Sequence, residues 1–331
     1  MDSNLCASIE RQDIDHLDAQ TIESAISFLK SYGDQAKIIA GGVDLISLIK
    51  KRVSLPHVLV NMKTIPGLAY IEKNVDGLKI GPLTTIHDIE LDDTVRNRFP
   101  MLAEAAQSIA SPQIRNMGTV GGNLCQDVWC WYYRRSPGTG RAFFCRRKGG
   151  DQCYAVSGDN RYHAVFNIGK CIAVCPSDLA PALIALQANL KITSPHGSRR
   201  IQLEDFYKPM GNCLEATDII TEIEIPWPER YAKQRFLKFR LRKAIDFAIA
   251  SVAVVLTTEN EIVKNARIVL GGVAPMPYRA GIAEKGLIGK PLDQSAALAA
   301  AEQYVSEAKP LSMNRYKLQI IKSIVKKGIL D

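Results

Sequence analysis

The chain has 331 residues, of which 47% are hydrophobic and 23% charged, and its formal net charge at pH 7 is +8. This composition excludes an intrinsically disordered protein and is sufficient for two or three domains with apolar cores. No run of about 18 consecutive apolar residues occurs, so the sequence predicts no membrane span.

The start of the sequence, MDSNLCASIERQDID, lacks the basic and apolar blocks of an export signal and has no twin-arginine leader. We therefore expect a cytoplasmic location. In such a reducing compartment disulfides are rare, and clustered cysteines more often bind metal or take part in redox chemistry.

The positive charge is compatible with a nucleic-acid partner but does not require one, because Lys and Arg are spread along the whole chain. Local excesses occur at residues 134–148 and in the C-terminal segment KLQIIKSIVKK. Both segments fit either a solvated loop and helix face or a surface that docks on an acidic partner subunit.

The first part of the chain has a mixed pattern of helices and strands. Residues 21–32 predict a short amphipathic helix, and residues 36–40 predict a buried strand. After a glycine pair, residues 43–52 predict a second helix, and residues 57–62 predict another strand. Residues 68–82 alternate around an Asp-Gly step, which is typical of a β-hairpin.

The rest of the chain continues this pattern, without internal repeats or low-complexity segments. Residues 101–110 predict a helix that ends at Ser111-Pro112, and residues 178–192 predict a helix that leads into a strand. Beyond residue 200, further strands and two helices predict a separate C-terminal unit. The fold class expected from these elements is α+β.

Two glycine pairs lie where the chain should change direction, in IAGGVDL (39–45) and GTVGGNL (118–124). Without a β-carbon, glycine allows backbone N–H groups to approach a phosphate or a flat ring closely. Neither pair matches the G-x-G-x-x-G or P-loop pattern, and each alone is compatible with a plain turn.

Together with PSD at 176–178 and KFRLRKAIDFAIASVA at 238–253, these motifs resemble the FAD-binding medium subunits of the molybdenum hydroxylase (xanthine dehydrogenase) family. The first loop is similar to the family's AGGTDLL, with Val43 in place of Thr, and the second is similar to TxGGNL. The resemblance implies a two-part FAD-binding domain of the PCMH (vanillyl-alcohol-oxidase-like) type and a C-terminal α+β domain like that of the CO dehydrogenase flavoprotein. The implied boundaries are 1–62, 63–200 with an insertion at 124–175, and 201–331.

The resemblance also implies which residues bind FAD. Backbone amides of the two loops would hold the cofactor, and two residues of the PSD motif would bind its hydroxyl groups, since a carboxylate accepts hydrogen bonds from hydroxyls. Val43 removes one hydroxyl contact but leaves the backbone contacts intact. The implied FAD-binding residues are Ile38, Ile39, Ala40, Gly41, Gly42, Val43, Asp44, Gly118, Thr119, Gly121, Gly122, Asn123, Ser177 and Asp178.

Six of the eight cysteines lie between the second glycine loop and the PSD motif. They are Cys125, Cys130, Cys145, Cys153, Cys171 and Cys175. Their spacing contains neither the close C-x2-C pairs of zinc ribbons nor the C-x2-C-x2-C-x3-C run of bacterial ferredoxins. Spacing alone therefore leaves an iron–sulfur cluster, zinc and buried thiols open.

A subset of the family carries a 4Fe-4S cluster in such an insertion, namely the 4-hydroxybenzoyl-CoA reductase β subunit and the flavin subunit of a periplasmic aldehyde oxidoreductase. The runs NLCQDVWCWYYRR and FFCRRKGGDQC resemble the first of these. The implied ligands are Cys130, Cys145, Cys153 and Cys171. The gap from Cys153 to Cys171 is longer here than in the reductase, so Cys175 competes with Cys171 as the fourth ligand. Cys125 is expected to be a buried neighbour of the flavin loop.

The residues around these cysteines admit two interpretations each. The cations Arg134, Arg135, Arg146, Arg147 and Lys148 could raise the cluster's potential and attract an acidic electron donor, or could only solvate a loop. The aromatics Trp129, Trp131, Tyr132 and Tyr133 could cover the cluster or line a partner interface. His163 is expected to be a hydrogen-bonded structural residue rather than a ligand, and Cys6 and Cys213 have no assigned role.

The resemblance implies an electron-transfer subunit that contains FAD and a 4Fe-4S cluster and has no catalytic residues for the substrate. Its implied partners are a molybdopterin-containing large subunit and a 2Fe-2S small subunit, in a dimer of heterotrimers, with ferredoxin, NAD or a quinone as external carrier and no nucleic acid. Dehydroxylation like that of 4-hydroxybenzoyl-CoA reductase is one reaction it suggests, and oxidation of an aldehyde or N-heterocycle is another. A free-standing flavin oxidase of the same fold is an alternative within redox chemistry, and a zinc-stabilised basic RNA-binding module is the alternative of a different class.

Overall fold

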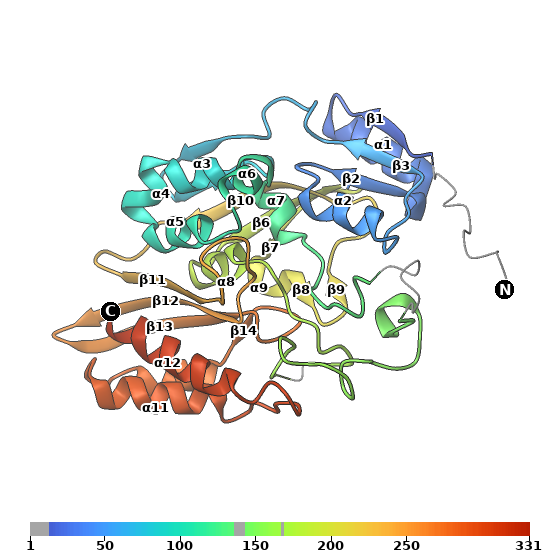
Figure 1. Cartoon of the computed structure of the whole chain (residues 1–331). Helices are drawn as coiled ribbons and strands as arrows, with labels where there is room; N and C mark the ends of the chain where they lie inside the picture. The colour runs from blue at the N-terminus through green and yellow to red at the C-terminus, as the bar shows by residue number, and fades with distance from the viewer. Residues whose placement is uncertain (1–12, 136–142, 167–168) are drawn as a thin grey trace, which may run out of the picture.

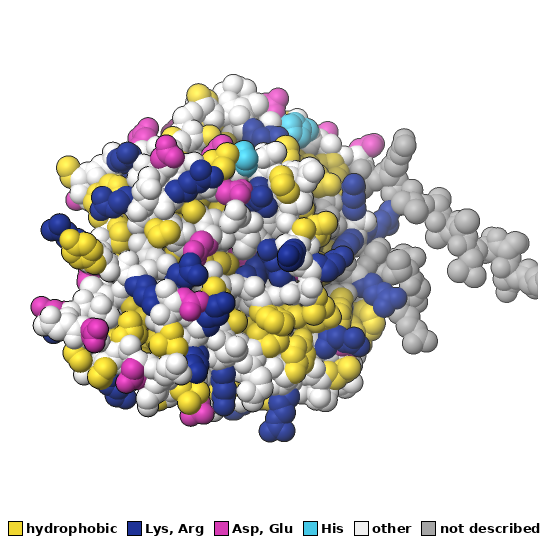
Figure 2. Space-filling view, turned by 60° about the vertical axis from the view of Figure 1, so that its left-hand side comes forward, with side chains coloured by type: hydrophobic (Ala, Val, Ile, Leu, Met, Phe, Trp, Pro, Cys, Tyr) yellow, Lys and Arg dark blue, Asp and Glu magenta, His cyan; other side chains and the backbone are white. Residues whose placement is uncertain are grey.

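The computed structural model describes residues 13–135, 143–166 and 169–331 (Figure 1). Cys6 lies outside these ranges. Within them, no helix is long and apolar enough to cross a membrane. Lys and Arg side chains are mixed with acidic and hydrophobic ones over the face seen in Figure 2, as expected from their even spread along the chain.

The N-terminal part is a three-stranded parallel sheet in the order β1-β3-β2. Helix α1 connects β1 to β2, and α2 connects β2 to β3, as parallel pairing requires a crossover. Helix α1 begins at a capping box formed by Thr21 and Ser24, and its apolar face is buried on the sheet. The elements of this part are β1 (Asp15–Asp18), α1 (Ile22–Tyr32), η1 (Gly33–Gln35), β2 (Ala36–Ile39), α2 (Val43–Lys50) and β3 (Val58–Asn61).

A second sheet follows, with five antiparallel strands in the order β4-β5-β10-β6-β7. The predicted hairpin is confirmed as β4–β5. The strands are β4 (Ile71–Lys73), β5 (Gly77–Ile80), β6 (Asn189–Ser194), β7 (Gly197–Gln202) and β10 (Ile219–Pro226). The helices of this part are α3 (Ile86–Leu91), α4 (Asp93–Arg98), α5 (Pro100–Gln107), α6 (Pro112–Met117), α7 (Val120–Leu124), α8 (Leu179–Ala185) and α9 (Leu203–Phe206). The short pair β8 (Tyr207–Lys208) and β9 (Gly211–Asn212) completes it.

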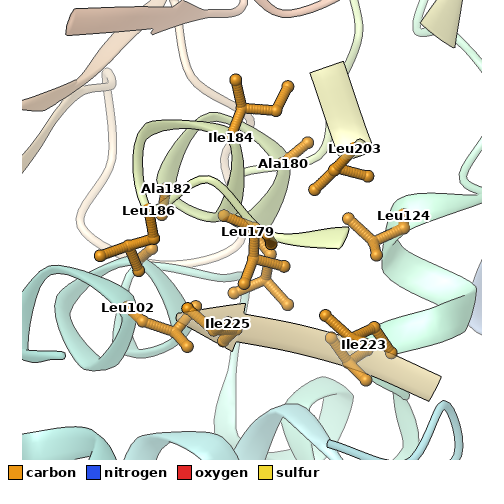
Figure 3. Packing of buried hydrophobic residues seen from close by; sticks show 14 of the residues in the cluster. Leu102, Leu124, Leu179, Ala180, Ala182, Ile184, Leu186, Leu203, Ile223 and Ile225 are labelled. Atoms are coloured by element: carbon orange, nitrogen blue, oxygen red, sulfur yellow. The ribbon is translucent and has the colours of Figure 1, made fainter. Parts of the chain in front are cut away.

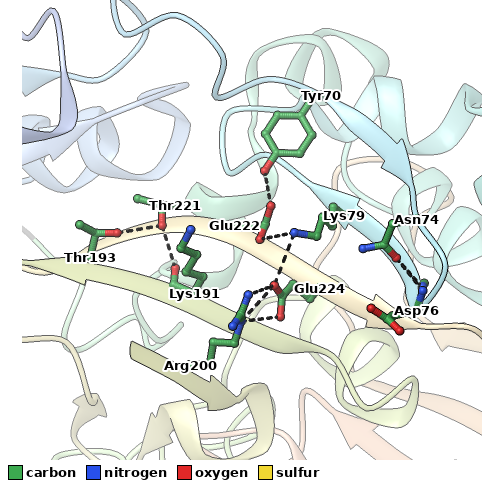
Figure 4. A network of polar contacts seen from close by, with 11 residues as sticks. Tyr70, Asn74, Asp76, Lys79, Lys191, Thr193, Arg200, Thr221, Glu222 and Glu224 are labelled. Carbon is green, nitrogen blue, oxygen red and sulfur yellow. Dashed lines mark hydrogen bonds and ion pairs between the residues drawn. The ribbon is translucent and has the colours of Figure 1, made fainter. Parts of the chain in front are cut away.

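The central strand of the second sheet, β10, comes from beyond the boundary predicted at residue 200, which itself falls within β7. Ile223 of β10 lies in register with Ile80 on one side and Leu190 on the other, and all three are buried. On the polar face of the sheet, Glu222 accepts hydrogen bonds from Tyr70 Oη at 2.8 Å and Lys79 Nζ at 3.1 Å (Figure 4). The strand is therefore fixed by apolar packing on one face and by ion pairs on the other.

The C-terminal part is a four-stranded antiparallel sheet in the order β11-β12-β13-β14. Helices α10 to α12 cover one face of it, and α8 lies on the other face (Figure 1). Its elements are β11 (Lys233–Phe239), β12 (Ala250–Glu259), β13 (Ile262–Gly271), β14 (Tyr278–Arg279), α10 (Gly281–Leu287), α11 (Gln294–Val305) and α12 (Lys317–Leu330).

Helix α8 joins the second and third sheets into one core. Every residue from Leu179 to Ala185 is buried, and the helix packs against Ile223 and Ile225 of β10 (Figure 3). The same apolar cluster includes Ala253 and Val269 of the C-terminal sheet, whose strands β12 and β13 the helix contacts. A helix that is apolar on all sides is stable only in such an interior position.

In the described residues of the cysteine-rich insertion, which lies between α7 and α8, regular structure is limited to η3 (Arg146–Lys148) and isolated bridges. Its two ends are joined by an antiparallel bridge, in which Trp129 and Val174 exchange N–H···O hydrogen bonds of 2.8 and 3.2 Å. The C-terminal domain holds its middle: Asn314 Nδ2 donates to the carbonyl oxygens of His163 and Ala164, and Met313 N–H donates to Asn160 Oδ1. The insertion is thus held both at its base and against the C-terminal domain.

Candidate functional site

A cavity of about 790 Å³ lies where the N-terminal sheet, the second glycine loop and the C-terminal domain meet. Most of the predicted FAD-binding residues line it: Ile38, Ala40, Gly41, Gly42, Val43, Asp44, Gly118, Thr119, Gly121, Gly122, Asn123 and Asp178. Ile39 and Ser177 do not line it. This volume falls in the range of cavities that bind cofactors and other small molecules. We refer to it as the large cavity.

The two glycine loops are in direct backbone contact in this cavity. A β-carbon at Gly41 would overlap the carbonyl oxygen of Met117, and one at Gly121 would come within 2.9 Å of the carbonyl oxygen of Pro82. Gly42 has a φ of +70°, where glycine is favoured, and is the N-cap of α2. Glycine at these positions therefore allows both loops to expose their backbone at the cavity wall.

Polar side chains of the second loop hold its shape. Thr119 caps α7 by accepting a hydrogen bond from Gly122 N at 3.1 Å. Ser177 Oγ donates to Asn123 Oδ1 at 2.6 Å and accepts from Ala180 N at 3.1 Å. Ser177 thus connects the loop to α8 from behind, and its hydroxyl has partners within the protein.

Asp178 forms a buried ion pair at the cavity wall. Its Oδ2 lies 2.6 Å from Lys238 Nζ, and only 5% and 4% of the two side chains are exposed. Lys238 also donates to the Ser108 carbonyl oxygen at 3.1 Å. Burial raises the pKa of Asp178 above its usual range, and the Lys238 ammonium opposes this rise. The sequence motif at 238–253 contained Lys238, but its pairing with Asp178 was not predicted.

The insertion also contributes to the large cavity. Arg134, predicted to act near the cysteines or to solvate a loop, is only 3% exposed and forms a bidentate pair with Asp44 at 2.6 and 3.1 Å. Trp129 lines the same cavity and packs on Phe247, with ring centroids 4.8 Å apart. Cys125 lines it as well, so it is a neighbour of the flavin loop as expected; the residue is exposed at the cavity, whereas burial raises the pKa of its thiol to about 12.

A second, smaller cavity lies within the insertion, and we call it the cysteine cavity. The four cysteines predicted as ligands, Cys130, Cys145, Cys153 and Cys171, all line it. Cys175 does not. It packs in the apolar core beside α8, where burial raises the pKa of its thiol to about 12. Among the described residues, no three His, Cys, Asp or Glu side chains are arranged to hold a single metal ion.

Two nitrogen atoms contact the sulfurs of this cavity. His163 Nε2 lies 3.2 Å from Cys130 Sγ, and Arg147 Nε donates to Cys171 Sγ at 3.2 Å. Burial lowers the pKa of His163 to about 4, with a contribution from Lys317, so its imidazole is neutral at pH 7. Its Nδ1 has no partner among the described residues, which favours the tautomer with the proton on Nε2. Burial also raises the pKa of the Cys130 thiol to about 12.

Aromatic rings cover the cysteine cavity. Tyr132 and Tyr133 line it, and Tyr132 contacts Phe143 edge to face with centroids 4.9 Å apart. Trp131 donates from Nε1 to the Asp159 carbonyl oxygen at 3.0 Å and packs near His163. Of the four aromatics considered in the sequence, Trp129 alone lines the large cavity rather than this region. Cys213 lies at neither cavity.

Two family descriptions match the chain. "FAD binding domain in molybdopterin dehydrogenase" matches residues 12–228, and "CO dehydrogenase flavoprotein C-terminal domain" matches residues 235–331. Together they account for almost the whole sequence.

Relatives of similar length include the glyceraldehyde dehydrogenase medium chain of Sulfolobus acidocaldarius, which is 27% identical over 95% of this chain and 96% of its own. The aldehyde oxidoreductase FAD-binding subunit PaoB of Escherichia coli is 32% identical over 91% and 92%. Among solved structures, CO dehydrogenase from Hydrogenophaga pseudoflava matches with a TM-score of 0.77 over 95% of both chains, at 26% identity.

Proposed function

Because the chain belongs to the FAD-binding medium subunits of the molybdenum hydroxylase family, we propose that it transfers electrons between FAD in the large cavity and a 4Fe-4S cluster in the cysteine cavity. FAD binding and a role as an oxidoreductase subunit follow from the family itself. The cluster is supported by one observation above all: the four cysteines predicted as its ligands line a single cavity.

The polar groups at the wall of the large cavity are suited to binding FAD. Backbone of both glycine loops is exposed at its wall, and N–H groups there can bind the pyrophosphate. Asp178, held by Lys238, offers carboxylate oxygen to a ribityl or ribose hydroxyl. Arg134 and Asp44 neutralise each other, so the first loop gains a fixed position without a net charge.

The cysteine cavity offers the ligand atoms that an iron–sulfur cluster requires. Four thiolates are the usual ligands of a 4Fe-4S cluster, and N–H groups directed at their sulfurs are the usual second layer. His163 and Arg147 supply such groups. Bound FAD supplies exchange between two-electron and one-electron transfer, and a bound cluster supplies single-electron transfer. Cys171 is the fourth ligand in this proposal, since Cys175 packs away from the cavity.

Metal and flavin analysis of the purified protein tests this proposal. We expect one FAD and about four iron atoms per chain. Cys171→Ala should lose the iron and keep the flavin, whereas Cys175→Ala, a matched change of a buried cysteine, should keep both. A wild-type protein that holds flavin but one zinc and no iron would contradict the cluster and leave the flavin assignment standing.

The charge of the surface beside the cysteine cavity is the basis for proposing which external electron carrier docks there. Arg146 and Lys170 line that cavity and are exposed, and Lys148 donates to the carbonyl oxygen of exposed Arg135 at 3.2 Å. We call these four residues the basic rim. Across the described parts of the chain, none of them forms an ion pair with a carboxylate within 4.0 Å. A cationic surface of this kind fits an acidic one-electron carrier such as a ferredoxin.

The rate of electron exchange with a ferredoxin at low ionic strength tests the rim. Arg146→Glu should slow it severalfold, and added salt should reduce the difference between variant and wild type. Lys327→Glu, the same charge change at an exposed position of α12, is the control and should have little effect. Equal rates for all three proteins would contradict a docking role.

The substrate reaction is proposed to take place on partner subunits. Relatives carry names such as "carbon monoxide dehydrogenase medium chain" and "6-hydroxypseudooxynicotine dehydrogenase complex subunit alpha". By analogy, this chain would assemble with a molybdopterin subunit and a 2Fe-2S subunit in the oxidation of an aldehyde or an N-heterocycle. Dehydroxylation of an aromatic acyl-CoA is not a reaction named for the relatives given above, and an RNA-binding module does not account for the two matched domains.

A further inference from the structure

A continuous chain of hydrogen bonds and ion pairs connects the two cavities. It begins at Asp44 in the first glycine loop, passes through Arg134 and Asp127, and ends at Arg147 beside the cysteine cavity. We call these four residues the arginine relay. Its members come from α2, from the start of the insertion and from η3, so the relay exists only in the folded protein.

At the FAD end, Arg134 is fixed by five hydrogen bonds. Its two Nη atoms hold both oxygens of Asp44, and Nη2 also donates to the Asp127 carbonyl oxygen at 2.6 Å. Its Nε donates to the Val128 carbonyl oxygen at 2.9 Å. Its backbone N–H donates to the Cys130 carbonyl oxygen at 2.8 Å. A guanidinium held in this way has one available orientation.

In the middle, Asp127 connects the large cavity to two residues of the cysteine cavity. Asp127 lines the large cavity, and its backbone N–H donates to Asp44 Oδ2 at 3.2 Å. Its carboxylate accepts from Tyr133 Oη at 2.6 Å and lies 3.5 Å from Arg147 Nη1. The carboxylate therefore positions two groups that line the cysteine cavity, although it contacts no cysteine itself.

At the other end, Arg147 contacts a sulfur atom. Its Nε donates to Cys171 Sγ at 3.2 Å, while Nη2 donates to the Pro209 carbonyl oxygen at 3.0 Å. Only 7% of its side chain is exposed. Its neighbour Arg146, by contrast, is exposed and donates to the carbonyl oxygens of Asp151 and Lys170, not to a sulfur.

We propose that Arg147 is a positioning residue that sets the reduction potential of the cluster through its hydrogen bond to Cys171 Sγ, and that Asp127 couples this bond to the FAD cavity. The inference rests on the proposed function, because it requires a cluster at the four cysteines. Reduction adds negative charge at the sulfurs, and a buried cation with an N–H directed at one of them stabilises the reduced state more than the oxidised state.

Redox titration of the cluster in the purified protein, followed by the electron paramagnetic resonance of its reduced form, tests the role of Arg147. Arg147→Met keeps a long side chain without charge or donor and should shift the midpoint potential to more negative values. Arg147→Lys, which keeps the charge, should shift it less. Arg146→Gln is the matched control, because it removes one cation from the same turn but no N–H from a sulfur, and its shift should be the smallest.

A double-mutant cycle tests the role of Asp127. Asp127→Asn should shift the midpoint potential in the wild-type background, and this shift should be largely lost in the Arg147→Met background, because Asp127 acts through Arg147. A purely through-space effect of the carboxylate would give the same shift in both backgrounds and would overturn the coupling. Flavin and iron content of each variant show that both cofactors are still bound.

The outcomes separate this inference from the proposed function. A wild-type protein without iron would refute the cluster, and with it the inference. If the wild-type protein holds a cluster but Arg147→Met and Arg146→Gln have the same midpoint potential, the inference alone is refuted. A larger negative shift for Arg147→Met than for Arg146→Gln supports it.

Discussion

Trp129 and Cys130 are consecutive residues whose side chains line different cavities. The Trp129 indole lines the large cavity beside Phe247, and the Cys130 thiol lines the cysteine cavity beside His163. Extended backbone places successive side chains on opposite faces, so a single stretch of main chain is the wall between the two cavities here. In the proposed function, the two cofactors would be separated by the thickness of this segment.

The first prediction concerns Trp129 as part of that wall. Trp129→Ala removes the packing on Phe247 and the cation–π contact with Arg134, whose guanidinium carbon lies 5.2 Å from the ring centroid. Aromatic contacts of this kind are worth about 0.5–1.5 kcal/mol, so we expect FAD to bind about two- to tenfold more weakly. Fluorescence titration with FAD measures this. Trp129→Phe should retain most of the affinity, and iron content should be unchanged in both variants.

The second prediction concerns the contact between the two glycine loops. Gly41→Ala places a methyl group on the Met117 carbonyl oxygen, so the loops must separate. Overpacking of this kind costs about 1–3 kcal/mol, and we expect a lower midpoint of thermal unfolding together with loss of flavin. Gly281→Ala is the control, because a β-carbon there meets open space. If the two variants had equal flavin content and stability, the close approach of the loops would not matter.

The third prediction concerns the buried pair of Asp178 and Lys238. Lys238→Met leaves the carboxylate buried without its cation, and breaking such a pair costs about 3–5 kcal/mol of unfolding free energy. Denaturant unfolding measures the loss. The double variant Asp178→Asn/Lys238→Met removes both charges and should recover a large part of it. Failure of the double variant to recover any stability would mean that packing, not charge, sets the effect.

The fourth prediction concerns pH and Lys317. This side chain is fully buried, and its Nζ donates to the carbonyl oxygens of His163 and Gly272 at 3.1 and 2.7 Å. Burial lowers its pKa from 10.5 to about 7. Between these values the unfolded chain binds more protons than the folded chain, so this residue makes the protein more stable as the pH rises from about 7 to 10.5.

Below about pH 7 Lys317 is protonated in both states, and its contribution no longer changes with pH. Because other groups titrate in the same pH range, the effect of Lys317 is measured as a difference between the wild type and a variant that lacks its amine. Unfolding free energies of the wild type and of Lys317→Met are determined from pH 6.5 to 9.5, and their difference isolates this residue. The wild type should gain stability relative to the variant over this range. A constant difference would show that Lys317 keeps its usual pKa when folded.

Much of the fold could be predicted because its signals are local. The apolar spacing of α1, the hairpin β4–β5 and the strand before the first glycine pair all depend on neighbours in the sequence. The position of β10 could not be predicted in this way. Its alternating pattern identified a strand, but its insertion between β5 and β6 depends on partners more than 25 residues away in the sequence.

The site shows the same limit. The four cysteines could be selected by resemblance, whereas their spacing alone left zinc and free thiols open. The pairing of Arg134 with Asp44 spans 90 residues, and that of Lys238 with Asp178 spans 60. Charged residues carry no sequence signal of their partner, because many oppositely charged neighbours are available along the chain. Only the folded backbone brings these pairs together.

The bridge between Trp129 and Val174 has a consequence for how such a subunit could arise. Because the two residues are hydrogen-bonded neighbours, the segment between them leaves and re-enters the flavoprotein at one point. A segment with adjacent ends can be added to or removed from a domain without stretching the parent chain. Under the proposed function, deletion of residues 130–173, with a short linker across the bridge, would therefore leave a flavoprotein without the cluster, and the reverse transfer would give a simpler homologue a second electron carrier in one genetic step.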